Sequence, residues 1–403
     1  MSFNIRVIKY GGSSLATVDR IRFVAEQIIE QKRPGEGIVI VASAMGDATD
    51  RLLSLAGEIS DDPPLRELDK VLGTGEHVST ALLSMALRRL GHDAVSLTGA
   101  QAGIHTTGGH FNAAVLRVDS RRIRDELAAG RIVVVAGFQG RNDAGEMTTL
   151  GRGGSDTTAV VLAGALDAAR CEICSDVDGV YSADPRIVDD ARRIDEISYT
   201  EMLEMARHGA SVLDPHAVEH ARHAGVEIHA RDTGRPDAPG TLIRDVRVDE
   251  PRVLGIAGHD ALIPLTLEDD QHRCAELTRL VSDVGVEDVL VDQTDVTTGR
   301  RNILIPSERL PDPRCFAAEL EKRLHGRVAV GPQCSSVSAI GLGVGRADHI
   351  RKVSRRSSQR AGVRPRGNFS GEHSVTCLVQ PGEALALTKA FHREFQCPTG
   401  GMA

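Results

Sequence analysis

The chain has 403 residues, of which 41% are hydrophobic and 26% are charged, and its formal net charge is −8. This length exceeds what one hydrophobic core usually supports, so we expect two or three domains. The acidic balance excludes a general nucleic-acid-binding surface, no apolar stretch is long enough to span a membrane, and the N-terminus lacks a signal-peptide core. The sequence therefore predicts a cytoplasmic globular protein that binds neither nucleic acid nor membranes.

Strand-like and helix-like segments alternate over residues 1–245. Short apolar runs predict strands at residues 4–12, 37–46, 131–140, 170–179 and 225–233. Amphipathic stretches predict helices at residues 17–31, 78–91 and 217–225. The first of these helices places one apolar stripe at Ile21, Val24, Ala25, Ile28 and Ile29. Strands buried on both faces with helices between them predict an α/β layered fold with a largely parallel sheet. Ligands of such sheets bind at the carboxyl ends of the strands.

The remaining chain reads as two small modules. The segments "DTGRPDAPGTLI" and "DVRVDEPRV" are rich in proline, glycine and charge and predict a boundary near residues 245–252. The stretch 252–330 combines strand-like runs with a helix at 272–285, and the stretch 334–403 combines strand-like runs with a helix at 384–395. Two α+β modules of similar order indicate an internal repeat of the kind that binds small ligands or pairs subunits.

The seven cysteines do not form a disulfide framework, because their number is odd and they are scattered. Cys171 and Cys174 make one C-x-x-C pair within a predicted strand. Strand residues three apart point to opposite faces, so we expect buried thiols and predict no metal site.

The first predicted strand runs through Lys9 into Gly11, Gly12, Ser13 and Ser14. Glycines let the backbone approach a ligand closely, and the serine pair is suited to cap the next helix. Backbone N–H groups and one ammonium group would then surround an anion, although the spacing is not that of a P-loop. The layout predicts a phosphate-binding loop in which Lys9 neutralises a transferring phosphoryl group.

The stretch "TLGRGGSDTTAVVLAGAL", residues 149–166, places Arg152, Ser155 and Asp156 before a helix expected to begin at Ala159. The Ser-Asp-Thr-Thr cluster is suited to cap that helix, whose N-terminus favours an anion. Arg152 offers a planar fork for a carboxylate or a phosphate. An ordinary strand-to-helix turn is the alternative for this stretch taken alone.

Two further transitions from strand to helix carry polar groups. Ser43 and Thr49 provide hydroxyl groups in "VASAMGDATDRLL", and Glu76 opens the helix in "GTGEHVSTALL". A carboxylate in a first helical turn compensates the helix dipole or receives an ammonium group. With Arg152 for a carboxylate and Glu76 for an amine, the set would bind an amino acid.

The turn-rich segment "CSDVDGVYSADPR", residues 174–186, holds three aspartates but lacks the later glutamate of a calcium loop. A turn that frames a nucleotide fits better. Tyr181 would then lie beside the base or ribose, and Arg186 near the phosphates.

Eight segments resemble, in order, those of the aspartate kinases of the amino-acid kinase family: "VIKYGGSSLA", "SAMGDATDRLL", "GTGEHVSTALLSMAL", "SLTGAQAGI", "VAGFQG", "TTLGRGGSDTTAV", "SDVDGVYSADPRIV" and "SYTEMLEMARHGASVL". The resemblance implies ATP-dependent phosphorylation of the β-carboxylate of L-aspartate, with Mg²⁺ on the phosphates. It implies a kinase domain over 1–245, with an aspartate-binding lobe to about residue 148 and an ATP-binding lobe from about residue 149. ACT-like modules at 252–330 and 334–403 would join subunits into a homo-oligomer.

By position, Lys9 and Asp156 resemble the catalytic pair, in which the lysine stabilises charge on the γ-phosphoryl group and the aspartate orients it. The residues that resemble the aspartate-binding set are Ser43, Thr49, Glu76, Arg152 and Ser155. The ATP site would combine the loop residues Gly11, Gly12 and Ser13 with Ser175, Asp176, Tyr181 and Arg186.

The chain departs from the family where "ASVLDP" replaces the common "AKVLHP". Ser211 then occupies the position of a lysine, and Asp214 occupies that of a histidine. Losing a cation and gaining an anion beside a nucleotide would weaken ATP binding unless Arg207, His208 or His216 compensates.

The C-terminal modules depart as well. Glu287 stands where the effector site of the family usually carries asparagine, so we expect little inhibition by lysine or threonine. The basic run 346–366 is expected to form a solvated helix face and loop, because its helix offers Ile350 and Val353 and then mostly serine, glutamine and arginine.

Two alternative functions stay open at this point. One is a kinase for another amino-acid carboxylate or for carbamate, and Glu76 with Arg152 argues against carbamate. The other is a regulatory or scaffolding subunit with the kinase fold and little activity. Lys9 and Asp156 argue against a scaffold, while Ser211 keeps it open.

Overall fold

The computed structural model of the chain describes residues 4–151, 153–210, 212–246, 250–268, 276–277, 280–281, 290–291, 300–307, 310, 313–323 and 328–395. Arg152, Ser211 and Glu287 therefore lie outside the described residues. The chain divides into two compact units. Unit 1 takes residues 1–180, 195–199 and 212–245, and unit 2 takes residues 181–194, 200–211 and 246–403. No helix in the described ranges is long and apolar enough to cross a membrane.

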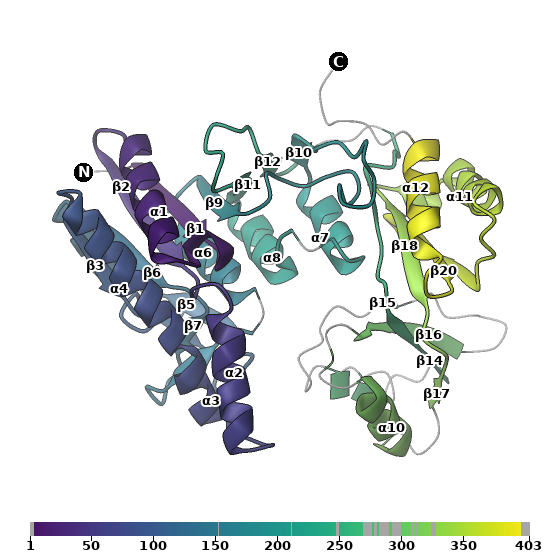
Figure 1. Cartoon of the computed structure of the whole chain (residues 1–403), viewed down its shortest axis with the longest axis horizontal. Helices are drawn as coiled ribbons and strands as arrows, with labels where there is room; N and C mark the ends of the chain where they lie inside the picture. Colours follow the sequence, from purple (N-terminus) through teal and green to yellow (C-terminus); the bar gives the residue numbers. More distant parts are fainter. Residues whose placement is uncertain are drawn as a thin grey trace. The chain divides into compact units, whose positions relative to one another are not determined.

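Unit 1 is built on a large sheet of eight strands (Figure 1). In spatial order the strands are β10 (Glu196–Ile197), β12 (Thr241–Ile243), β11 (Glu227–Asp232), β9 (Arg170–Ser175), β1 (Asn4–Tyr10), β2 (Glu36–Ala42), β6 (Ile132–Ala136) and β3 (Ala94–Leu97). All neighbouring pairs are parallel except β11 with β12. The mostly parallel α/β sheet expected from the buried apolar runs is confirmed.

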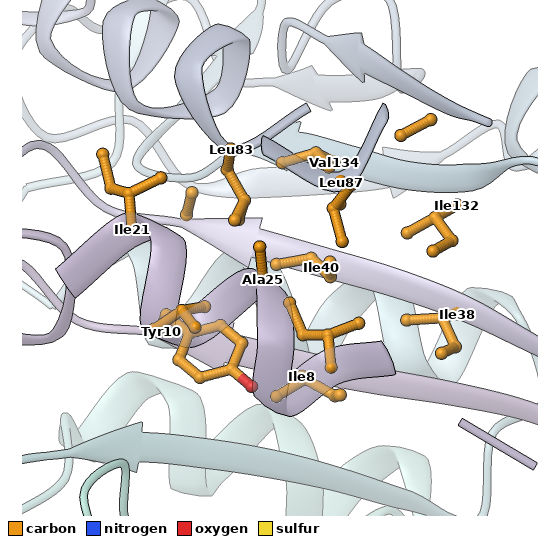
Figure 2. Packing of buried hydrophobic residues seen from close by; sticks show 14 of the residues in the cluster. Ile8, Tyr10, Ile21, Ala25, Ile38, Ile40, Leu83, Leu87, Ile132 and Val134 are labelled. Carbon is orange, nitrogen blue, oxygen red and sulfur yellow. The ribbon is translucent and has the colours of Figure 1, made fainter. Parts of the chain in front are cut away.

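Helices α1 (Val18–Gln31) and α4 (Thr74–Arg89) cover one face of this sheet. The apolar stripe predicted for α1 is confirmed, because four of its five residues are buried in the core cluster and Ile29 packs against it. In Figure 2, Leu83 and Leu87 of α4 lie over the same strands as Ile21 of α1. Leucine and isoleucine side chains of this size each contribute about 1.5–3 kcal/mol when fully buried. This layer therefore buries one face of the sheet beneath α1 and α4.

The opposite face packs against α6 (Gly154–Ala165), which in turn packs against α8 (Pro215–Ala224). Successive strand residues point to opposite faces. Ile8 and Tyr10 of β1 therefore join the core cluster, and Lys9 faces α6. On β9, Cys171 and Cys174 are both buried free thiols, as expected from their spacing.

A smaller sheet also belongs to unit 1. Its strands, in spatial order, are β5 (Val115–Val118), β4 (Ile104–Thr106), β7 (Gln139–Arg141) and β8 (Met147–Thr149). Helix α3 (Leu65–Leu72) packs against β8, and α2 (Ala48–Ile59) packs against α3. Helix α5 (Arg121–Ala128) packs against β6.

Unit 2 contains two four-stranded antiparallel sheets among its described residues. One has the order β15 (Leu290–Val291), β16 (Arg300–Pro306), β14 (Leu262–Glu268), β17 (Val328–Val330), and the other the order β13 (Gly255–Ala257), β18 (Ser335–Ile340), β20 (Ser374–Val379), β19 (Gly367–Ser370). The helices are α7 (Tyr199–Arg207), whose first residue belongs to unit 1, α10 (Pro313–Arg323), α11 (Asp348–Arg360) and α12 (Ala384–Phe395). Small antiparallel sheets with helices match the expected α+β modules. The two sheets do not follow one another along the chain. Strand β13 comes before all strands of the first sheet, yet it pairs with β18 of the second.

Helix α11 buries a serine face, which the sequence did not lead us to expect. Ile350, Ser354, Ser357 and Ser358 are all buried. Each of these serine hydroxyls donates to the carbonyl four residues earlier, at 2.9–3.0 Å. Because the helix backbone satisfies the hydroxyls, serine can fill core positions here at little polar cost. The expectation of a solvated face was correct only for the arginine side of the helix.

Candidate active site

Four adjacent parallel strands of the large sheet end at one edge. The residues at this edge are Gly11 after β1, Ser43 after β2, Gly137 after β6 and Ser175 as the last residue of β9. Main-chain hydrogen bonds join them: the Gly11 N–H donates to the Cys174 carbonyl at 3.1 Å, and the Ser43 N–H donates to the Tyr10 carbonyl at 3.1 Å. Because α/β proteins bind ligands at the carboxyl ends of their strands, this edge is the candidate site.

Lys9 and Asp156 form an ion pair at this edge. Lys9 Nζ lies 2.6 Å from Asp156 Oδ1, and each side chain is only 12% exposed. Little water screens such a pair, so the attraction is stronger than at the surface. The structure thus brings together, from β1 and α6, the two residues that the resemblance assigns to catalysis.

Helix α6 begins earlier than the sequence led us to expect. It starts at Gly154, and its N-cap is Gly153, whose φ of 72° suits a residue without a Cβ. The prediction that the Ser-Asp-Thr-Thr cluster caps a helix beginning at Ala159 is wrong, because those residues form the first turns of the helix itself. Asp156 consequently lies in the first turn, near the positive end of the helix dipole.

The end of β6 meets the start of α6. A Cβ on Gly137 would lie 2.6 Å from Ser155 Oγ, so the glycine leaves room for that hydroxyl. The next residue, Phe138, has a φ of 67°, which residues with a Cβ seldom adopt. Its N–H donates to Thr158 Oγ1 at 3.1 Å, and its carbonyl accepts from the Leu150 N–H at 2.9 Å. Strain of this kind gathers at functional sites, yet nothing in the sequence singled out Phe138.

Glu76 lies in the first turn of α4 and is 3% exposed. Its Oε1 accepts from the Ala44 N–H at 3.1 Å, whereas its buried Oε2 has no hydrogen-bond partner among the described residues. Burial strips water from the charge and raises the pKa of Glu76 to about 7, against the opposing effect of backbone hydrogen bonds. A buried oxygen without a partner is costly, so it marks a place where a cationic ligand would be stabilised.

Ser43 lies in the turn between β2 and α2, and Thr49 lies in the first turn of α2; both are half-buried. The N–H of Gly46 in this turn donates to the Gly12 carbonyl at 3.0 Å. That bond holds the turn beside the loop that follows β1. Glu76 is bonded to the same turn, so the predicted substrate hydroxyls and the buried carboxylate share one locality.

The glycine loop after β1 leads into a short 3-10 turn, Ser13–Leu15, before α1 begins. The N-cap of α1 is Thr17, whose Oγ1 accepts a backbone N–H of the first turn at 3.2 Å. The predicted cap by Ser13 and Ser14 is therefore wrong, because the helix starts later in the chain. Ser13 is exposed at the edge, whereas Ser14 is buried with its hydroxyl 2.7 Å from Thr233 Oγ1.

The residues predicted to bind ATP are distributed over both units. Ser175 is half-buried and Asp176 is exposed, both in unit 1, whereas Tyr181 and Arg186 belong to unit 2. The Arg186 guanidinium is bonded to Asp184, with Nη2 to Oδ2 at 2.7 Å. This carboxylate partly offsets the positive charge that Arg186 would offer a phosphate.

The segment after β11 also belongs to this edge, although no sequence motif singled it out. Arg235 bridges two carboxylates, Asp178 at 2.9 Å and Asp232 at 3.0 Å. The Thr233 N–H donates to the Ser175 carbonyl at 2.9 Å, so this segment continues the edge formed by β9. Its prolines and glycines read as part of a domain boundary, although β12 directly after it belongs to the large sheet.

Asp214 caps α8 and also touches the start of α6. Its Oδ1 accepts the first N–H groups of α8 at 3.0 and 3.2 Å. A Cβ on Gly153 would collide with its carboxylate. The helix N-terminus therefore partly neutralises this anion. His208, one of the residues expected to compensate for the missing lysine, is buried in unit 2 with Nδ1 2.9 Å from Ser338 Oγ.

Known proteins resemble this chain in both sequence and fold. The amino acid kinase family matches residues 4–232. An aspartokinase of Mycolicibacterium smegmatis is 41% identical over 96% of this chain and 95% of its own, and one of Corynebacterium glutamicum is 40% identical over 97% and 96%. The crystal structure of E. coli aspartokinase III in complex with aspartate and ADP shares the fold, with a TM-score of 0.80 at 24% identity over 97% of this chain and 100% of that one. The chain therefore belongs to the aspartokinases of the amino acid kinase family.

Proposed function

We propose that this protein transfers the γ-phosphoryl group of ATP to the β-carboxylate of L-aspartate, giving 4-phospho-L-aspartate and ADP. The observation that carries the proposal is the shielded Lys9–Asp156 pair at the carboxyl edge of the parallel sheet. The family of the chain supports the reaction, since its relatives are named aspartokinases and a protein of the same fold has been crystallised with aspartate and ADP.

The reaction needs no general base, because a carboxylate is already ionised at neutral pH. A carboxylate oxygen bonds to the γ-phosphorus, and the bond from that phosphorus to the β,γ-bridging oxygen breaks, so ADP leaves with the electron pair. Two anions must approach each other, so catalysis consists of positioning and charge neutralisation. Lys9 stabilises charge on the transferring group, and Asp156 fixes the direction of the Lys9 ammonium.

Aspartate would be held at both ends. Glu76 Oε2 takes the α-ammonium, because that oxygen is buried and otherwise lacks a partner. Arg152 takes the α-carboxylate, a role that rests on the resemblance alone. The hydroxyl groups that complete the substrate site are those of Ser43, Thr49 and Ser155.

The nucleotide would lie along the loops after β1 and β9. The residues assigned to it are Gly11, Gly12, Ser13, Ser175, Asp176, Tyr181 and Arg186. Among the described residues no group of three or more His, Cys, Asp or Glu side chains is arranged to hold a metal. Magnesium that arrives with the phosphates suits such a site, since it keeps several waters and needs one or two carboxylates at most. Bound there, Mg²⁺ would neutralise phosphate charge.

The domain roles and the assembly are part of the same proposal. Residues 1–245 carry catalysis, and the ACT-like modules of the C-terminal region join subunits into a homo-oligomer. We place the enzyme in the cytoplasm, since the described cysteines 171, 174, 334 and 377 are all free thiols, as is usual in a reducing compartment. Light scattering coupled to gel filtration, on the full chain and on residues 1–245, tests the assembly: a monomeric full chain contradicts it.

A hydroxamate assay tests the reaction. The purified chain is incubated with aspartate, ATP, Mg²⁺ and hydroxylamine, which traps an acyl phosphate as a coloured hydroxamate. Colour that requires all of aspartate, ATP and chain supports the proposal, and glutamate in place of aspartate tests the acceptor. A folded parent chain that forms no hydroxamate with any amino acid would favour the scaffolding alternative.

A further inference from the structure

Asp69 is a buried carboxylate for which the proposed reaction gives no role. It lies on α3 and is 0% exposed. Three groups donate to it: the Phe111 N–H to Oδ1 at 3.0 Å, the Thr149 hydroxyl to Oδ1 at 2.6 Å, and His110, whose Nδ1 lies 2.6 Å from Oδ2. Burying a carboxylate is costly unless hydrogen bonds satisfy its oxygens, and these three groups do so.

The three donors come from two segments that lie beside the substrate edge. His110 and Phe111 belong to the loop between β4 and β5, and Thr149 is the last residue of β8. The Ala113 N–H donates to the Thr149 carbonyl at 2.9 Å, so the two segments also bond to each other. Asp69 therefore clamps the loop onto the end of β8.

This clamp acts on the chain immediately before α6. Two residues after Thr149 comes Gly151, with a φ of 75°, and a Cβ on it would collide with Asn112 of the clamped loop. Arg152 and the N-cap Gly153 follow in sequence, and then the turn that carries Asp156. The position of the loop thus limits where the chain enters the proposed substrate site.

The clamped loop holds a conformation that it would not adopt unaided. Phe111 has a φ of 71° and is 37% exposed, so an L-residue with a large side chain occupies the left-handed region. Such strain persists only where surrounding contacts over-determine the backbone. The hydrogen bond from the Phe111 N–H to Asp69 is one of these contacts.

The outer end of the clamp reaches the surface. Nε2 of His110 lies 3.5 Å from Glu146 Oε2, and Glu146 is in turn paired with Arg66. His110 is 18% exposed, so the clamp joins a fully buried carboxylate to a solvated ion pair. The imidazole therefore lies between two carboxylates, and its orientation is set from both sides.

We propose that Asp69 is a positioning residue for the acidic substrate: with His110 and Thr149 it holds the loop at residues 110–113 and the end of β8 so that the segment entering α6 binds aspartate. The inference rests on the proposed function. It assigns Asp69 no contact with substrate or nucleotide. Its loss should therefore weaken aspartate binding while the nucleotide half of the site and the transfer step stay intact.

The test compares two neighbouring threonines that are both 0% exposed. Thr149→Val removes a donor to Asp69, whereas Thr148→Val breaks the buried bond of 2.6 Å between Thr148 and Thr106 and leaves the clamp alone. We expect Thr149→Val to raise the KM for aspartate about tenfold, the effect of losing about one charge-assisted hydrogen bond. In Thr149→Val the KM for ATP and the kcat should change less than about twofold. Thr148→Val should leave all three constants within about twofold of the parent. Both estimates assume that the aspartate and nucleotide halves of the site act independently.

Three further variants make the test sharper. Asp69→Asn should raise the KM for aspartate at least as much as Thr149→Val. His110→Ala should raise it too, whereas His110→Asn, whose amide can donate from near the position of Nδ1, should restore most of the affinity. Melting temperatures of all variants show that the assays are run on folded protein.

The possible outcomes separate the two proposals. An active parent with equal aspartate KM values for Thr149→Val and Thr148→Val would overturn the positioning role and leave the reaction standing, and this comparison holds even if Asp69→Asn fails to fold. A rise in the KM for ATP equal to that for aspartate would show a purely structural role. A parent chain without hydroxamate formation would overturn the proposed function and this inference with it.

Discussion

Replacing Glu76 by glutamine should stabilise the fold while weakening aspartate binding. Glu76 is 3% exposed, one of its oxygens lacks a partner, and its pKa rises from 4.5 to about 7. At about 1.4 kcal/mol for each pKa unit, the ionised carboxylate then costs about 3 kcal/mol of folding free energy. Glutamine keeps the shape and can still accept the Ala44 N–H, but it carries no charge to bury.

Proton binding to Glu76 sets the direction in which folding stability changes with pH. Between pH 4.5 and pH 7 the folded chain holds a proton on Glu76 that the unfolded chain has released, so folding stability falls as the pH rises through this window. Below pH 4.5 parent and Glu76→Gln should be about equally stable. Above pH 7 the variant should be more stable by about 3 kcal/mol, the full cost of ionising the buried group.

The measurement is denaturant-dependent hydrogen exchange of peptides from α4, at pH 5 and pH 8, without ligands, because the chain has two units and global unfolding need not be two-state. Glu30→Gln on the exposed face of α1 is the matched control, since it removes the same charge from a solvated position. The same Glu76→Gln protein should show a raised KM for aspartate and a nearly unchanged KM for ATP. A stability difference that is absent at pH 8, or equal at both pH values, would refute the reasoning, because the carboxylate would then not be desolvated.

Substitutions at Lys9, Arg152 and Asp214, and added lysine or threonine, test the remaining assignments. Lys9→Met should lower kcat by roughly 100- to 1000-fold with the circular dichroism spectrum intact, and turnover within a few-fold of the parent would contradict its role. Arg152→Ala should raise the KM for aspartate far more than that for ATP, and the reverse pattern in initial-rate kinetics would exchange the two sites. Asp214→Ala should lower the stability measured by urea unfolding by about 1 kcal/mol, because α8 loses its cap, whereas Asp214→Asn should lose little. Lysine and threonine at millimolar levels should inhibit weakly, since Glu287 replaces the expected asparagine, and strong inhibition in the hydroxamate assay would show that the effector site is intact.

Local periodicity in the sequence was enough to predict five of the eight strands of the large sheet in unit 1. Alternating and continuous apolar runs placed β1, β2, β6, β9 and β11, and the stripe on α1 predicted which face of that helix is buried. These features depend on side chains a few residues apart, and the chain itself sets their spacing. Glu76 was recognised in the first helical turn for the same reason. The order of the eight motifs indicated the family, which the spacing within any one motif could not establish.

Where helices begin was harder to predict, because several polar residues near a start compete for the cap. Ser13 and Ser14 were expected to cap α1, but Thr17 does so. The polar cluster at residues 155–158 lies inside α6, because Gly153 takes the left-handed conformation there. The serine face of α11 is buried for a related reason: its hydroxyls bond to their own helix, which polarity alone does not reveal.

Only the tertiary structure decided how distant side chains meet. The parallel register of β1 with β9 and the packing of α6 bring Lys9 and Asp156 to 2.6 Å, and the fold leaves Glu76 Oε2 buried without a partner. The clamp at Asp69 likewise joins three elements that are separated in the chain. Burial and electrostatic strength depend on which segments exclude water together, and this is a property of the packed chain rather than of any window of its sequence.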